Sequence, residues 1–193
     1  MALTTLDPVT ALIVIDLQQG IVGMPGTAHP TAEVVQRSAA LAEAFRSRNL
    51  PVVLVNVVGA PRVRTDMNPS GAAVLGQNLA TDWAALVPEL GDHPADLRIS
   101  KSARSALSNP ELRDALRSVG ATQLVLTGIA TSSGVESTAR QAFDEGYHLS
   151  LVTDAMTDSS VEAHEHSVTR IFPRIGETGT TAELLELLER RGE

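Results

Sequence analysis

Cysteine is absent from this chain, and aromatic residues make up only 3% of it. Without thiols the protein can form no disulfide, no thiolate metal site and no covalent intermediate on a cysteine. With so few aromatic side chains, the core must be built mainly from Ala, Val, Leu and Ile. The sequence also lacks an apolar run of the roughly 20 residues that span a bilayer, and it begins without a signal-peptide pattern. We therefore expect a cytoplasmic protein without a membrane partner.

Lysine is scarce as well. Of the 15 basic residues, 14 are arginine, and Lys101 is the only lysine. A general bias toward arginine explains the ratio, but a lysine that persists under such a bias is a candidate for a chemically required residue. A solvated surface lysine is the alternative. Because the net charge is −8 and no basic patch stands out, we do not expect nucleic acid as a partner.

The chain is long enough for a full core, and we predict a single domain over residues 1–193. Apolar runs alternate with helical patterns along it. The runs that predict strands are 11–15, 52–57, 97–100, 123–128, 148–153 and a short edge strand at 172–175. The patterns that predict helices are 31–48, 110–119, 134–145, 162–170 and 182–190. This alternation is typical of an α/β fold whose sheet is mainly parallel and is covered by helices on both faces.

Three candidate groups follow strands in this prediction. Asp16 comes directly after an apolar run, Lys101 follows another, and a turn of small residues at 130–134 follows a third. In open parallel sheets ligands bind beyond the carboxyl ends of the strands, and the helix N-terminus after such a turn attracts anions. A carboxylate behind five apolar residues also needs a partner. Lys101 is a candidate partner, and the pair is either reactive or structural; a carboxylate that caps nearby N–H groups is the alternative.

The stretch 59–96 is long and irregular, and it holds Arg62, Arg64 and Trp83 among many Pro and Gly residues. A loop of this length in a compact domain is usually functional or flexible. The alternative is a surface excursion in which Trp83, the only tryptophan, fills the core beneath the loop. The sequence leaves both interpretations open.

Several motifs together resemble a known family. They are I-V-I-D-L-Q at 13–18, I-S-K at 99–101, T-G-I-A-T-S-S-G-V-E-S-T-A-R at 127–140, D-A-M-T-D at 154–158 and a late helix with His164. In order and spacing they are similar to those of the isochorismatase-like hydrolases, also called the cysteine hydrolase family. The resemblance implies a Rossmann-like three-layer α/β/α sandwich with a mainly parallel sheet of about six strands. It also implies a cytoplasmic homo-oligomer, a dimer or a tetramer.

The resemblance implies a site as well. In the family an Asp, a Lys and a Cys hydrolyse small amides through a thioester, and the first two correspond to Asp16 and Lys101. The position of the family cysteine is occupied here by Gly134, which cannot attack a carbonyl. The family pattern further implies a cis peptide bond between Ile129 and Ala130, and an oxyanion hole formed by the N–H groups of Ala130 and Gly134.

Loss of the nucleophile leaves three interpretations, of which the first is acid catalysis. The isochorismatases resemble this chain in having glycine at the position of the cysteine, and they cleave a vinyl ether. Asp16 would then be the acid, and Lys101 would help to set its pKa and hold an anionic substrate. The residues predicted to contact a small polar or anionic substrate are Gln18, Arg62, Arg64, Arg104, Ser132 and Ser133. Isochorismate itself is not the expected substrate, because isochorismatases are expected to carry Tyr-Ala-His where this chain has Ala-Thr-Ser at 130–132.

The second interpretation is an amidase or esterase that uses Ser132 or Ser133, although no histidine lies near them in sequence to take the proton. The third is a non-catalytic protein that binds a small molecule or a partner and has kept the fold. The five histidines show no Asp-x-His spacing, and His164 and His166 are predicted to lie on different faces of a helix. We therefore predict no metal site and no cofactor.

Overall fold

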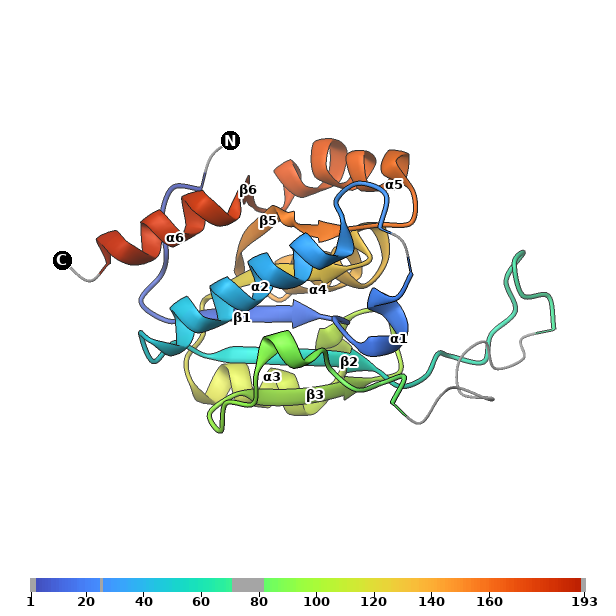
Figure 1. The fold of residues 1–193 in the computed structure, drawn as a ribbon, viewed down its shortest axis with the longest axis horizontal. Helices are drawn as coiled ribbons and strands as arrows, with labels where there is room; N and C mark the ends of the chain where they lie inside the picture. Colours follow the sequence, from blue (N-terminus) through green and yellow to red (C-terminus); the bar gives the residue numbers. More distant parts are fainter. Residues whose placement is uncertain (1–2, 25, 71–81, 192–193) are drawn as a thin grey trace.

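The computed structural model describes residues 3–24, 26–70 and 82–191. Six parallel strands form one sheet in the order β3-β2-β1-β4-β5-β6, and helices cover both of its faces (Figure 1). The strands are β1 (Thr10–Ile15), β2 (Val52–Val57), β3 (Leu97–Lys101), β4 (Gln123–Ile129), β5 (His148–Thr157) and β6 (Glu177–Gly179). This arrangement confirms the predicted α/β/α fold with a parallel sheet.

The helices begin where capping side chains satisfy their first N–H groups. Asn109 accepts a hydrogen bond from the Glu111 N–H at the start of α3, and Thr180 and Glu183 form a reciprocal capping box at the start of α6. The helices are α1 (Gln19–Val22), α2 (Thr31–Arg46), α3 (Pro110–Ser118), α4 (Glu136–Asp144), α5 (Val161–His166) and α6 (Thr181–Arg190). Within the described ranges, no helix has the length and apolarity needed to cross a membrane.

Strand β1 lies at the centre of the core, and all of its residues are buried. Successive side chains of a strand point to opposite faces of the sheet. Ile13 and Ile15 therefore pack with residues of α3 and α4, while Leu12 and Val14 pack with residues of α2 and α6. A parallel strand that is covered on both faces requires such an uninterrupted apolar run, which is why the sequence signals β1 so clearly.

The predicted edge strand at 172–175 is wrong. This segment forms a turn of 3₁₀ helix, Phe172–Arg174, and the edge strand is β6 a few residues later. The side chain of Phe172 is fully buried against the sheet. Its apolar character therefore reflects the packing of a turn onto the core and not the pattern of a strand.

The predicted end of β5 at 153 is also wrong, because the strand continues to Thr157. Its second half pairs with the end of β4 after a register shift between Leu126 and Gly128. Gly128 has φ +121°, and a Cβ built there would lie 2.0 Å from the carbonyl oxygen of Ile15. Only glycine permits this close approach, which brings the end of β4 against the end of β1.

The segment 59–70 projects beyond the carboxyl ends of the strands and away from the body of the protein (Figure 1). It contains no helix and no named strand. Residues 71–81 of the predicted irregular stretch lie outside the described residues. Trp83 is half-buried, and its ring packs where a Cβ of Gly20 would stand, 1.9 Å from the nearest ring atom. Trp83 thus packs against α1 and does not belong to the core clusters.

Candidate functional site

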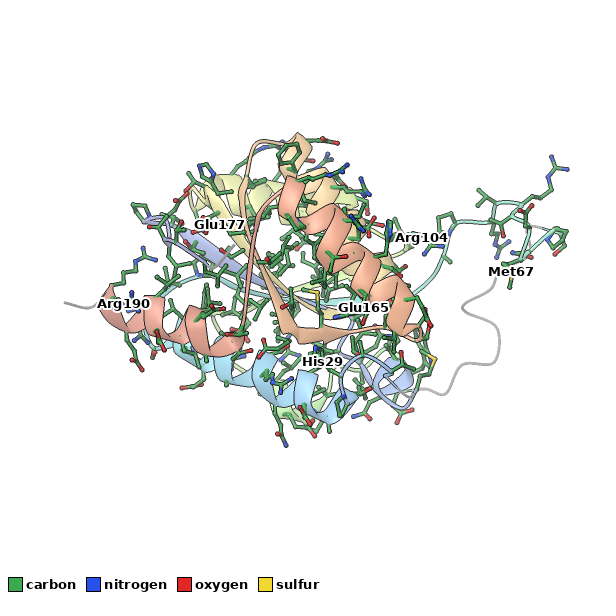
Figure 2. The ribbon with its side chains drawn as sticks, turned by 90° about the horizontal axis from the view of Figure 1, so that it is seen from above. His29, Met67, Arg104, Glu165, Glu177 and Arg190 are labelled. Atoms are coloured by element: carbon green, nitrogen blue, oxygen red, sulfur yellow. The ribbon has the colours of Figure 1, made fainter. Side chains whose placement is uncertain are left out.

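A cleft of about 690 Å³ opens at the carboxyl ends of β1, β3 and β4. Its polar and charged lining residues are Asp16, Thr65, Asn68, Lys101, Ser102, Arg104 and Ser133. The remaining lining is apolar or small and includes Ile21, Met24, Val57, Pro61, Val63, Met67, Ile129, Ala130 and Gly134. Figure 2 shows Arg104 on the body, close to where the projecting segment begins, and Met67 far out on that segment. The cleft therefore lies between the rim of the sheet and the segment 59–70.

Asp16 and Lys101 form a buried ion pair at the base of the cleft. The Nζ of Lys101 lies 2.7 Å from Oδ2 of Asp16, and the two residues are only 4% and 5% exposed. The other carboxyl oxygen, Oδ1, is buried and has no hydrogen-bond partner among the described residues. Burial raises the pKa of Asp16, and the charge and hydrogen bond of Lys101 oppose that rise without cancelling it. The pair is therefore asymmetric, with one oxygen held by a cation and the other free.

The backbone turns sharply at Asp16 to present this side chain. Its N–H donates to the carbonyl of Val55 at 2.8 Å, as in a continuing strand, but its φ is +56°. The left-handed region is unfavourable for a residue with a side chain, and aspartate is among the few that adopt it. Backbone strain of this kind is concentrated at functional sites, which makes Asp16 a candidate on conformation as well as on burial.

Gly134 lies directly against this carboxyl group. A Cβ built on Gly134 would stand 3.2 Å from Oδ2 of Asp16 and 3.2 Å from Cγ2 of Ile15. The glycine belongs to a π-helical turn, Thr131–Val135, that joins β4 to α4. The peptide bond that leads into this turn, between Ile129 and Ala130, is cis. The turn thus brings its backbone to the acid at the end of β1.

The turn has a cleft face and a back face. On the cleft side, Nη1 of Arg104 donates to Oγ of Ser133 at 2.5 Å. On the back, the hydroxyl of Thr131 lies 2.8 Å from Nδ1 of His164. The N–H and hydroxyl of Ser132 both donate to Oδ2 of Asp158, each at 2.8 Å. Residues that follow β5 therefore hold the back of the turn.

The structure brings together six of the predicted site residues: Asp16, Lys101, Arg104, Ala130, Ser133 and Gly134. Ser132 does not line the cleft, because its hydroxyl and N–H are both bound to Asp158 behind the turn. Arg62 and Arg64 are exposed on the projecting segment, and neither belongs to the cleft lining.

Gln18 is also absent from the lining, and the prediction that it contacts substrate is not supported. Its side chain is fully buried, with Oε1 accepting from the N–H of Val57 and Nε2 donating to the carbonyls of Val57 and Trp83. Since the amide is bound to backbone on both sides, Gln18 ties the loop after β1 to β2.

Sequence reasoning missed the roles of Asp158 and His164 as supports for the turn. His164 is 7% exposed, and its ring stands edge-to-face with His29 at 5.4 Å between centroids. Burial lowers the pKa of His164, the nearby His29 lowers it further, and Asp158 and Glu165 oppose the shift. A lone histidine on a short helix gives no sequence signal for this contact, because the two partners are far apart in the chain. His166 is exposed, as its predicted place on a different helix face requires.

No group of three or more His, Asp or Glu side chains that could hold a metal ion occurs in the described parts of the chain.

Comparisons with known proteins give a consistent result. The family model for the isochorismatase domain matches residues 10–183. The isochorismatase family protein YwoC of Bacillus subtilis (strain 168) is 40% identical over 180 residues, which cover 92% of this chain and 93% of that protein. The family protein YecD of Escherichia coli O157:H7 is 38% identical over 184 residues, covering 93% and 96%. A solved structure of a family protein from Burkholderia thailandensis is 41% identical, with a TM-score of 0.88, and covers 96% of this chain and 98% of that one.

Proposed function

The chain belongs to the isochorismatase family of hydrolases, and from that premise we propose that it hydrolyses a small anionic molecule through acid catalysis by Asp16. The reaction type that fits is hydrolysis of a vinyl-ether bond without a covalent enzyme intermediate. The observation that carries this proposal is the free oxygen of the buried Asp16 carboxyl group. YwoC and YecD, the similar proteins named above, are known only as family members, so the chemistry is argued from the cleft.

Asp16 has the environment of a proton donor. Burial raises its pKa, which favours the protonated form. Lys101 occupies Oδ2, so the proton belongs on Oδ1, the oxygen without a partner. A carboxylic acid with a raised pKa at the wall of a cleft is suited to general acid catalysis.

The steps balance without a nucleophile on the protein. Asp16 transfers its proton to the terminal carbon of the vinyl ether, which forms a C–H bond and an oxocarbenium ion. Water then forms a C–O bond to that ion, and its proton returns to the carboxylate. The resulting hemiketal breaks the original ether C–O bond and releases an alcohol and a carbonyl compound. Gly134 supports this route, because it places no side chain against Asp16, where a Cβ would stand only 3.2 Å from Oδ2.

The charges of the cleft favour an anionic substrate. Its charged lining is Asp16, Lys101 and Arg104, so it is positive by one charge with Asp16 ionised and by two with Asp16 protonated. The chain as a whole carries a net charge of −8, so the positively charged cleft differs in sign from the rest of the protein. Among the described residues, the guanidinium of Arg104 is bound only to Ser133 and has no carboxylate partner. It is available to bind a carboxylate of the substrate.

The two alternatives are supported less well. Ser133 lies beside the guanidinium of Arg104, which cannot accept a proton, and Ser132 faces away from the cleft. A serine nucleophile therefore lacks a base. A non-catalytic binding protein accounts for the cleft and its charge, but it gives no reason for a buried carboxyl oxygen without a partner, which costs free energy.

The test is a hydrolysis screen of the wild type, Asp16→Asn and Ser133→Ala on isochorismate, simple anionic vinyl ethers, amides and esters. We expect turnover of an anionic vinyl ether that falls by about 10³-fold in Asp16→Asn and persists in Ser133→Ala. Turnover of amides or esters that depends on Ser133 would overturn the proposal in favour of the serine hydrolase. Saturable binding of an anion without turnover of any substrate would favour the binding protein.

A further inference from the structure

The turn at the rim of the sheet is held from behind by two residues that line no part of the cleft. Asp158 accepts the N–H and hydroxyl of Ser132, and His164 bonds the hydroxyl of Thr131. Thr131 is fully buried, and this is the only hydrogen bond of its side chain among the described residues. The two residues that follow Ser132, by contrast, line the cleft. The back contacts therefore anchor the turn on the side away from the cleft.

The position of the turn matters because of Gly134. The site of its missing Cβ is only 3.2 Å from the carboxyl oxygen of Asp16 that Lys101 binds. A shift of the turn by a few tenths of an ångström changes the packing around that carboxyl group. Misplacement of about 1 Å in a reacting geometry costs about 10²-fold in rate.

We propose that His164 is a positioning residue for the hydrolytic site. Through its hydrogen bond to Thr131, His164 holds the turn, and with it Gly134, at a fixed position relative to Asp16. The predicted effect of His164 on the rate rests on the proposed function. The predicted effect of His164 on the position of the turn does not depend on which reaction is catalysed. His164 itself touches no part of the cleft, so it acts through the turn and not on the substrate.

The surroundings of His164 keep it neutral near neutral pH. The groups that face it are His29 from the loop before α2, Asp158 from the end of β5, and Glu165 from its own helix. Burial and His29 lower the pKa of His164, and the two carboxylates oppose them only in part. The proposal places the proton of the neutral ring on Nε2, so that Nδ1 accepts the hydroxyl proton of Thr131. Protonation turns Nδ1 into a donor to the hydroxyl oxygen, so the hydroxyl must rotate and its own proton loses its acceptor.

The pH dependence follows with a definite sign. Below the pKa of His164 the hydrogen bond to Thr131 reverses its direction, which shifts the turn, and the rate falls. Above the raised pKa of Asp16 the acid is ionised and the rate also falls. The proposal thus predicts a bell-shaped profile with its acidic limb from His164 and its alkaline limb from Asp16, which requires the pKa of Asp16 to lie above that of His164.

The experiment compares His164→Asn, His164→Leu, Thr131→Val and the control His166→Asn, which changes an exposed histidine on the same helix. The amide introduced by His164→Asn reaches the position of Nδ1 but does not titrate. We expect kcat of His164→Asn within about threefold of the wild type with the acidic limb lost, and a loss in kcat of about 10²-fold for His164→Leu and Thr131→Val with little change in KM. Because both substitutions break one contact, their double variant should lose no more than either alone.

A second readout does not need a substrate. In the wild type, the amide resonance of Gly134 in NMR spectra should titrate with the same midpoint as the His164 ring. That titration should vanish in His164→Asn and persist in His166→Asn. If the two midpoints differ, or if His164→Asn keeps the acidic limb, the positioning role is overturned. If the Gly134 titration is seen but no vinyl ether is turned over, the proposed reaction fails while the coupling stands. If His164→Leu does not fold, His164→Asn and Thr131→Val still decide the question.

Discussion

Two ion pairs in this protein, one buried and one partly buried, use their carboxylates differently. Arg46 at the end of α2 binds Asp96 through two nitrogens, Nε at 3.2 Å and Nη2 at 2.6 Å, so that each carboxyl oxygen is held. Asp16 and Lys101 make a single contact of 2.7 Å, and the second oxygen of Asp16 has no partner among the described residues. A buried carboxylate is stabilised only when hydrogen bonds satisfy the lone pairs of both of its oxygens. The Arg46–Asp96 pair meets this condition, and the Asp16–Lys101 pair leaves one buried carboxyl oxygen without a partner among the described residues.

The largest expected effect comes from making the same substitution, Asp to Asn, in each of the two ion pairs and comparing the rates of hydrolysis. Asp16→Asn should lower the rate of hydrolysis by about 10³-fold. It should also lower the free energy of unfolding by about 3 kcal/mol, since it leaves the buried Lys101 without its carboxylate. Asp96→Asn should leave the rate per folded molecule unchanged and lower the free energy of unfolding by about 3 kcal/mol, since the largely buried guanidinium of Arg46 loses its two-point carboxylate contact. Steady-state kinetics and urea unfolding measure both. Equal losses of rate in the two variants would contradict the comparison.

Replacing the cation of the reactive pair should move the pH profile. Lys101→Met removes the charge that opposes the effect of burial, so the pKa of Asp16 should rise further. The alkaline limb of the rate profile then shifts to higher pH, and the rate at neutral pH falls by about 10²-fold as the anion loses a charged contact. The measurement is kcat/KM from about pH 5 to about pH 10, which brackets the expected shift. An acidic limb that moves to higher pH while the alkaline limb stays in place would show that Asp16 acts as a base.

Arg104 should matter for binding more than for turnover. Arg104→Met should raise KM for an anionic substrate by about 30-fold and leave a neutral analogue nearly unaffected. Arg64→Met is the matched control, because Arg64 is exposed and does not line the cleft. Initial-rate kinetics on an acid and its methyl ester separate the two. A change of equal size for both substrates would indicate a loss of structure and not of a charged contact.

The smallest effect is expected at Gly134. The added methyl group in Gly134→Ala would lie 3.2 Å from Oδ2 of Asp16, closer than comfortable packing allows. The carboxyl group must move by a few tenths of an ångström, and kcat should fall by about tenfold with little change in the melting temperature. Rapid-quench kinetics and thermal unfolding report the two quantities. A rate equal to that of the wild type would mean that the acid tolerates displacement.

Much of the architecture could be read from local pattern. The unbroken apolar run of β1 predicts a strand covered on both faces, and the positions of Asp16 and Lys101 directly after strands predict their place at one rim. The segment 172–175 misled the prediction, because an apolar turn and an apolar strand look alike in a short window. The end of β5 was missed because its second half is extended by pairing with β4 and not by its own sequence.

The sequence by itself determined the family, the fold class, the absence of a cysteine nucleophile and the candidacy of Asp16 and Lys101, because each depends on residue identity and short-range spacing. Only the tertiary structure decided how these groups are used. It selected Arg104 over Arg62 and Arg64 for the cleft, bound the amide of Gln18 to backbone, and left one oxygen of Asp16 free. It also brought His164 behind the turn. Such contacts join segments far apart in the chain, and their geometry depends on packing that no local pattern encodes.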